Sequence, residues 1–296
     1  MRKAGSLTKI PAAMTDPVVW MNGGVVSQSA ARLDPLSQGF LHGVGVYDSL
    51  LLRAGRPVFL TRHLRRLADG AARLQLPAPD AVTVQSAITL LTEAHGLTEG
   101  RVRITLAAGA SPTMHPGPAT NNITLITLAP LSPVKESAAL TVTRFRRNEH
   151  SPLAGIKFTA CADSILAQRA ALAAGSDEAL FLNNAGEVCE GAFSNIFLVI
   201  AGHVVTPPPA SGCLPGVTRE VVLELCASHG VPAEEKTLGT ASLREAEEIF
   251  VTSSIRGIQP VHRLDDHALA APGKITLQIK ALLESHIQAV KLNSEL

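Results

Sequence analysis

The sequence predicts two mixed α/β or α+β domains with a cleft between them. The chain has 296 residues, of which 46% are apolar, and this length can bury the core of one large domain or two smaller ones. Strand-like runs and segments with helical spacing of apolar residues occur together in both halves. Between the halves, Ala129-Pro130-Leu131-Ser132-Pro133 fits neither period. We therefore expect a loose arm at residues 1–17, a smaller domain at 18–130 and a larger one at 134–296.

The smaller domain is expected to open with a hairpin, because Asn22-Gly23-Gly24 follows a short apolar run from Val18. A strand over residues 47–52 comes next. The helix that follows is indicated by Leu60, Leu64, Leu67, Ala71 and Leu74 at helical spacing, with Thr61 as its expected N-cap. A second helix is predicted over 83–95, and strands over 101–106 and 123–128, where apolar and polar residues alternate in the first.

The larger domain is expected to contain at least five strands and three helices. The strands are predicted near Leu140, Leu180, Ile196, Val204 and Phe250, and the helices over 163–174, 218–228 and 275–290. No internal repeat and no low-complexity segment interrupts this pattern.

Composition excludes several classes of protein. Twenty-six basic residues against 25 acidic ones give a net charge of +1, without the basic excess of a nucleic-acid binder. No run approaches the ~18 apolar residues of a membrane span, and the N-terminal segment lacks the apolar core of a signal peptide. The four cysteines are Cys161, Cys189, Cys213 and Cys226, and they show neither CxxC pairs nor metal-type spacing with histidine. We expect a cytoplasmic protein with reduced thiols and no metal site.

Two segments could hold a phosphate group. Leu214-Pro215-Gly216-Val217-Thr218-Arg219 places a glycine turn directly before a predicted helix, whose free N–H groups favour an anion. Thr252-Ser253-Ser254 follows a predicted strand and offers hydroxyl groups. The alternative for each segment is an ordinary helix cap or turn. Arg66, at the edge of an apolar helix stripe, could bind an anion or could simply extend from the core margin into solvent.

Two charged residues stand among apolar neighbours. Lys157 lies in Ala154-Gly155-Ile156-Lys157-Phe158, where desolvation would lower its pKa, as a lysine that forms a Schiff base requires. The alternative is a lysine that extends from a strand edge. Glu190 lies in a similarly apolar run, in which a carboxylate needs a cationic partner, and a structural salt bridge would explain it equally well.

In this order, the segments resemble the class IV aminotransferase family, the pyridoxal-phosphate enzymes of fold type IV. The resemblance runs from about Trp20 to Leu282. Its blocks are the glycine-rich entry to a strand at 39–48, the H-x-x-R-L helix at 63–67, Gly155-Ile156-Lys157, residues 184–197, Gly216-Val217-Thr218-Arg219 and Thr252-Ser253-Ser254.

The resemblance implies a role for each of these residues. Lys157 would form the Schiff base and Glu190 would meet the pyridine nitrogen. The cofactor phosphate would be held by Arg66, Val217, Thr218, Ser253 and Ser254. Tyr47, the only tyrosine, would contact cofactor or substrate. The family also implies pyridoxal 5′-phosphate bound between the two domains, a small amine or amino acid as substrate, and a homodimer.

The member of the family is harder to infer. D-amino-acid aminotransferases carry an R-x-H pair, whereas this chain has Thr113-Met114-His115, which retains only His115 as a candidate for binding substrate. The arginine-containing strand motif of branched-chain enzymes is also missing, although Arg101 and Arg103 are nearby. In contrast, residues 147–157 and Thr252-Ser253-Ser254-Ile255-Arg256-Gly257 resemble 4-amino-4-deoxychorismate lyases.

The leading hypothesis is therefore a lyase that forms 4-aminobenzoate and pyruvate for folate synthesis. In this hypothesis Arg256 meets a substrate carboxylate, and its alternative is a surface arginine on a loop. The second hypothesis is an aminotransferase for a branched-chain amino acid, a D-amino acid or an (R)-amine. A third is a protein that binds the cofactor without turnover, and the presence of both Lys157 and Glu190 argues against it.

Overall fold

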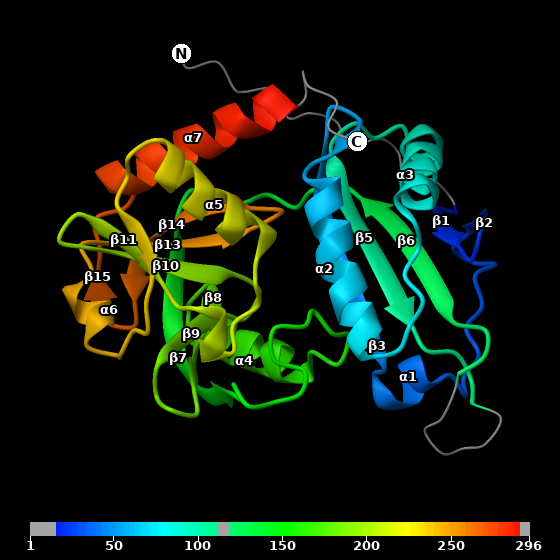
Figure 1. The fold of residues 1–296 in the computed structure, drawn as a ribbon, viewed down its shortest axis with the longest axis horizontal. Helices are drawn as coiled ribbons and strands as arrows, with labels where there is room; N and C mark the ends of the chain where they lie inside the picture. The colour runs from blue at the N-terminus through cyan, green and yellow to red at the C-terminus, as the bar shows by residue number, and fades with distance from the viewer. Residues whose placement is uncertain (1–15, 112–118, 291–296) are drawn as a thin grey trace, which may run out of the picture.

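The computed structural model describes residues 16–111 and 119–290, which form two β-sheets with helices packed against them (Figure 1). The first sheet is antiparallel and has the strand order β2-β1-β6-β5-β3-β4. Its strands are β1 (Val18–Met21), β2 (Gly24–Ser27), β3 (Gly45–Arg53), β4 (Arg56–Pro57), β5 (Gly100–Ala107) and β6 (Ile123–Ala129). The helices of this part are α1 (Gln38–His42), α2 (Leu60–Arg73) and α3 (Ala81–His95).

The second sheet has nine strands in the order β12-β11-β10-β13-β14-β7-β8-β9, and β15 pairs with β14. Its strands are β7 (Ala138–Arg147), β8 (Glu178–Asn183), β9 (Val188–Gly191), β10 (Asn195–Ile200), β11 (His203–Thr206), β12 (Ala233–Glu235), β13 (Glu248–Ser253), β14 (Gly257–Leu264) and β15 (His267–Ala268). The helices are α4 (Ala162–Ala173), α5 (Val217–Ser228), α6 (Ser242–Glu245) and α7 (Lys274–Val290). Strand β7 runs parallel to both of its neighbours, so the sheet is mixed.

Apolar burial explains why these segments form these elements. The first core lies between the first sheet and helices α2 and α3, with Leu67 and Ile88 from the helices and Leu50 and Ile104 from the strands. The second sheet has apolar residues on both faces. Strand β10 shows this directly, because Ile196 belongs to the core cluster on one face and Phe197 to the cluster on the other.

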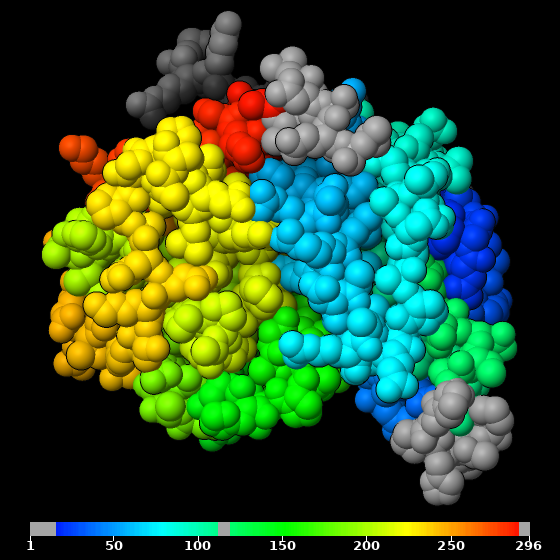
Figure 2. All heavy atoms as spheres, viewed as in Figure 1, coloured from blue at the N-terminus to red at the C-terminus, as the bar shows by residue number. Residues whose placement is uncertain are grey.

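Two sets of contacts place the loop after β7 and helix α2 between the sheets. The amide of Tyr47 in β3 donates to the carbonyl of Lys157 at 2.8 Å, so this loop adds to the first sheet. Helix α2 faces α5, where Arg62 forms ion pairs with Glu220 at 3.2 Å and Glu224 at 2.8 Å. Figure 2 shows the two halves meeting along α2. Tyr47, Lys157 and helix α2, which carries Arg66, therefore lie where the two halves meet.

The mixed two-sheet fold confirms the fold class expected from the sequence. The hairpin at Asn22 and all the predicted longer helices are present, with ends that shift by one or two residues. Thr61 as a helix cap is wrong, because α2 begins at Leu60 after Phe59, and no side chain caps it. The chain passes from one sheet to the other between Ala129 and Ala138, but its division into an arm and two domains stays a prediction.

Candidate active site

Lys157 and Tyr47 meet at the edge of the first sheet. Lys157 follows a turn at Gly155, whose positive φ of 76° suits glycine. The Nζ atom lies 4.7 Å from the centre of the Tyr47 ring, and the Lys157 side chain is half-buried. Within the described ranges, no carboxylate lies at ion-pair distance from this amine. The amine is therefore not held in a salt bridge with any carboxylate of the described residues.

Glu190 lies on β9 and has one donor on each carboxylate oxygen. Arg147 Nε donates to Oε1 at 2.9 Å, and the amide of Leu214 donates to Oε2 at 2.9 Å. Burial raises the pKa of Glu190, while Arg147, the Leu214 amide and Lys157 act in the opposite direction. Glu190 is therefore held by one donor from β7 and one from the loop before α5.

Arg66 is held in place by a buried carboxylate. Its Nε and Nη2 atoms donate to the two oxygens of Asp48 at 2.9 and 2.8 Å, and Nη1 donates to the carbonyl of Pro215 at 3.2 Å. His63 Nδ1 lies 2.8 Å from Asp48 Oδ1. Burial alone would raise the pKa of Asp48, but Arg66 and His63 hold it well below its usual range. Because these bonds use three of the five N–H groups of a guanidinium, Arg66 keeps two donors for an anion.

The amino end of α5 offers backbone donors to an anion. Its N-cap is Gly216, which brings no capping side chain, so the first amides of the helix, those of Val217 and Thr218, find no acceptor in the described structure. A Cβ atom at residue 216 would overlap Oδ1 of Asn195, and this explains why glycine stands there. Asn195 Nδ2 also donates to the carbonyl of Leu214 at 2.8 Å and fixes the preceding loop.

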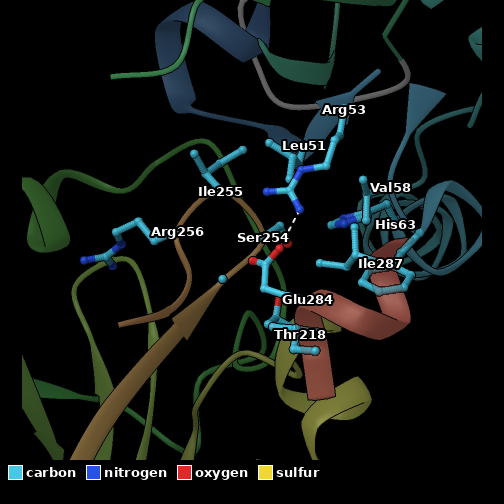
Figure 3. A pocket seen from close by; sticks show the side chains of 13 residues that line it. Leu51, Arg53, Val58, His63, Thr218, Ser254, Ile255, Arg256, Glu284 and Ile287 are labelled. Carbon is cyan, nitrogen blue, oxygen red and sulfur yellow. Dashed lines mark hydrogen bonds and ion pairs between the residues drawn. The ribbon is translucent and has the colours of Figure 1, made fainter. Parts of the chain in front are cut away.

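A small cavity of about 50 Å³ joins this helix end to the turn after β13 (Figure 3). Thr218, Ser254 and His63 line it, and the Arg53–Glu284 ion pair of 2.7 Å closes one side. Its volume gives room for a few water molecules. His63 Nε2 is buried without a hydrogen-bond partner, so the lining of the cavity includes an imidazole nitrogen that could hydrogen-bond to a bound group. Two residues that the sequence predicts as phosphate ligands, Thr218 and Ser254, therefore line the same cavity.

These residues fit pyridoxal phosphate. The uncapped amides of α5, the spare donors of Arg66 and the hydroxyls of Thr218 and Ser254 suit a phosphate group. Lys157 supplies an amine for covalent attachment, and Glu190 supplies a carboxylate for a ring nitrogen. The sequence predicted these residues from separate segments, and the fold brings them to one junction. Their individual roles stay predictions.

Three other predicted residues have different outcomes. His115 lies outside the described residues. Ser253 Oγ accepts from the backbone amide of Arg256 at 3.2 Å and from its Nε at 3.4 Å, so this hydroxyl stabilises its own turn. The guanidinium of Arg256 points away from the cavity and pairs with Glu178 at 2.6 Å (Figure 3). A substrate contact by Arg256 remains a prediction without a supporting contact.

The sequence reasoning missed several residues that complete the site. Asp48 and His63 support Arg66, Arg147 supports Glu190, and Arg103 stacks on the Tyr47 ring with its guanidinium carbon 3.7 Å from the ring centre. One signal was available for Asp48, because an acidic residue inside an apolar strand requires a cationic partner. No pattern in the neighbouring sequence indicated the contacts of His63, Arg147 and Arg103 with their partners.

Replacement of Arg66 by alanine is expected to raise the dissociation constant for pyridoxal phosphate. A hydrogen bond to a charged group contributes roughly 1.5–3 kcal/mol, which corresponds to about 10- to 100-fold in affinity. The measurement is a titration of apoprotein with cofactor. Thermal unfolding is followed in parallel, because the substitution also removes the arginine that pairs with the buried Asp48. Arg65→Ala is the matched control, since Arg65 is 60% exposed and pairs with Glu220. Equal cofactor affinity in the two variants would assign Arg66 a structural role only.

Comparison with known proteins gives a consistent result. A family model described as amino-transferase class IV matches residues 45–264. A Methanocaldococcus jannaschii protein, named provisionally as a branched-chain-amino-acid aminotransferase, is 30% identical over 271 residues, with 88% of this chain and 93% of that protein covered.

Two solved structures are similar over most of their length. The branched-chain aminotransferase of Thermoproteus uzoniensis, crystallised with norvaline, has a TM-score of 0.84 at 27% identity and covers 93% of this chain and 95% of that one. A Legionella pneumophila protein, described provisionally as a 4-amino-4-deoxychorismate lyase, has a TM-score of 0.81 at 25% identity and covers 87% and 96%.

Proposed function

Because the chain belongs to the class IV aminotransferase family, whose members use pyridoxal phosphate, we propose that it transfers an amino group between an amino acid and a keto acid. The similarity to the Methanocaldococcus and Thermoproteus proteins, both named for branched-chain amino acids, supports an amino acid of this type as donor. The (R)-amine alternative finds less support, because a simple amine has no carboxylate for the cation described next. This cation does not distinguish a D-amino acid from an L-amino acid, since both carry a carboxylate.

The observation that carries this proposal is the position of Arg103. Its guanidinium carbon lies 3.7 Å from the centre of the Tyr47 ring, and the Lys157 amine lies 4.7 Å from the same point. No carboxylate of the described chain pairs with Arg103, and its Nε donates only to the Thr105 hydroxyl at 3.2 Å. A half-buried arginine that contacts the same aromatic ring as the Lys157 amine suits the carboxylate of an amino acid or keto acid.

The residues of the site would then divide the work. Bound pyridoxal phosphate supplies an electron sink for the substrate carbon that carries the amine. Lys157 would hold the cofactor covalently and, once released, would remove the proton from that carbon and return one later. Glu190 would keep a proton on the ring nitrogen, and Arg66, Val217, Thr218 and Ser254 would anchor the phosphate. Tyr47 would contact the cofactor or substrate, with Arg103 beside it for the substrate carboxylate.

A lyase acting on 4-amino-4-deoxychorismate is the second candidate, and the likeness to the Legionella protein favours it. The contact expected between Arg256 and a substrate carboxylate does not add to this support, because Glu178 already pairs with that guanidinium. In either case we expect a homodimer, as the resemblance implies, and a cytoplasmic location, as the cysteine pattern predicts. Sedimentation velocity would measure the mass of the dimer.

Two incubations separate the candidates. With an amino-acid panel and 2-oxoglutarate as acceptor, we expect a new keto acid and a new amino acid in equal amounts. With aminodeoxychorismate and no acceptor, we expect at most a trace of pyruvate. A lyase needs no acceptor, because the amine leaves with the aromatic product. Many turnovers of pyruvate release without an acceptor, and no transfer from any amino acid, would therefore replace the aminotransferase proposal with the lyase.

A further inference from the structure

One buried carboxylate connects the two ends of the candidate active site. Glu178, the first residue of β8, is 2% exposed. Its Oε1 accepts from the backbone amide of Phe193 at 2.7 Å and from the hydroxyl of Ser194 at 2.9 Å. Its Oε2 accepts from Nη2 of Arg256 at 2.6 Å. The carboxylate thus accepts from three donors that belong to two separate segments of the chain.

The first of these segments, Phe193 and Ser194, follows directly after the strand that carries Glu190, the residue predicted to meet the ring nitrogen. Phe193 and Ser194 connect β9, which ends just after Glu190, to β10, which begins at Asn195. The packing around this connection is tight, since a Cβ atom at Gly191 would lie 2.7 Å from Oε1 of Glu178. A shift of the carboxylate would therefore be transmitted to the end of β9.

The second segment is the turn predicted for the phosphate. Arg256 bonds to Ser253 through both its backbone amide and its Nε, as described above, and its Nη1 donates to Gln259 Oε1 at 3.0 Å. Ser254, which lines the cavity, lies between Ser253 and Arg256 in the chain. One guanidinium therefore fixes the shape of the turn and also ties it to Glu178.

We propose that Glu178 and Arg256 are a positioning pair that holds the Ser254 turn at a fixed place relative to the strand carrying Glu190. The inference rests on one part of the proposed function, namely that pyridoxal phosphate binds across these two segments. It assigns Arg256 to cofactor binding through the turn and not to the substrate carboxylate. The planar guanidinium suits this role, because it reaches Ser253, Gln259 and Glu178 with separate N–H groups, whereas a lysine has a single nitrogen.

The test compares cofactor affinity with the substrate constant in Arg256→Ala. Loss of the pair is expected to raise the dissociation constant of pyridoxal phosphate about tenfold in a titration of apoprotein. At saturating cofactor, the KM for whichever substrate the wild type turns over should stay within about twofold. The ³¹P resonance of the bound phosphate should also move, because the turn beside it loses its anchor. Arg263→Ala is the matched control, since Arg263 lies on β14 and bonds to the carbonyls of Asp265 and Gly175.

Glu178→Gln is the second variant and protects the test against misfolding of the first. It keeps the volume of the side chain but removes the charge. Like Arg256→Ala, it should raise the dissociation constant of pyridoxal phosphate and move the ³¹P resonance. A KM raised about tenfold with unchanged cofactor affinity would overturn the proposal and assign Arg256 to the substrate. Cofactor affinity equal to wild type in both variants would also overturn it. Failure of the wild type to bind pyridoxal phosphate would instead contradict the proposed function itself.

Discussion

Replacement of Lys157 by alanine is expected to abolish turnover, with a loss of at least about 10³-fold, because the proposed mechanism uses this one amine as both covalent anchor and proton carrier. The structure gives this side chain no other task. Its Nζ makes no ion pair in the described part of the chain and lies 4.7 Å from the centre of the Tyr47 ring. The variant should therefore fold as the wild type does and keep its thermal stability.

Borohydride reduction of the holoenzyme followed by peptide mapping locates the attachment. We expect the pyridoxyl group on Lys157, and no labelled peptide in Lys157→Ala. The matched control is Lys135→Ala, since Lys135 is 73% exposed and pairs with Asp177. Label on a different lysine, or turnover that survives in Lys157→Ala, would contradict the assignment.

Local chemistry explains which parts of the fold the sequence could predict. The turn at Asn22 and Gly23 requires positive φ angles of 47° and 104°, and asparagine and glycine are the residues that adopt them readily. Helix α3 has its apolar residues at helical spacing and an aspartate, Asp80, whose side chain accepts from the amide of Thr83. Such signals lie within a few residues of each other and need no tertiary contact.

Strand β14 shows where this reasoning fails. It contains Pro260, which lacks a backbone donor and normally marks an edge strand or a loop. Yet β14 lies inside the sheet, between β13 and β7, and its pairing with β7 shifts register just after Pro260, between Val261 and Arg263. Pro260 is paired with Phe250 of β13, and the pairing with β7 begins only at Val261, so the proline faces no β7 partner. No local pattern indicates this arrangement.

In the candidate site, too, some residues could be predicted from the sequence and others could not. Lys157 and Glu190 stand out because charged residues among apolar neighbours need an explanation, and the family resemblance supplied one. The partners of Arg66 and Arg256 depend on contacts across the fold. Asp48 lies 18 positions before Arg66, and Glu178 lies 78 positions before Arg256. Because an arginine alone does not reveal its acceptor, the sequence assigned Arg256 to the substrate.

Replacement of Glu190 by glutamine is expected to lower kcat about 100-fold while the protein still binds pyridoxal phosphate. Loss of one preorganised electrostatic partner costs on the order of 3 kcal/mol in the barrier. A neutral amide has about the same volume but accepts from only one of the two donors, Arg147 or the Leu214 amide, and it cannot hold a proton on the ring nitrogen. Glu187→Gln is the control, since Glu187 bonds to Asn183 in the neighbouring turn. Its kcat should stay close to wild type.

The pH profile tests the same role independently of the rate at one pH. Burial raises the pKa of Glu190 in the free protein, so protonation at low pH should remove its charge earlier than for an exposed glutamate. The wild type should therefore lose kcat/KM as the pH falls through this raised pKa, and Glu190→Gln should lack that acidic limb. A variant that is folded and loaded with cofactor, but has wild-type kcat and the same acidic limb, would show that Glu190 does not act on the ring nitrogen. Its contacts with Arg147 and Leu214 would then be purely structural, as the salt-bridge alternative from the sequence holds.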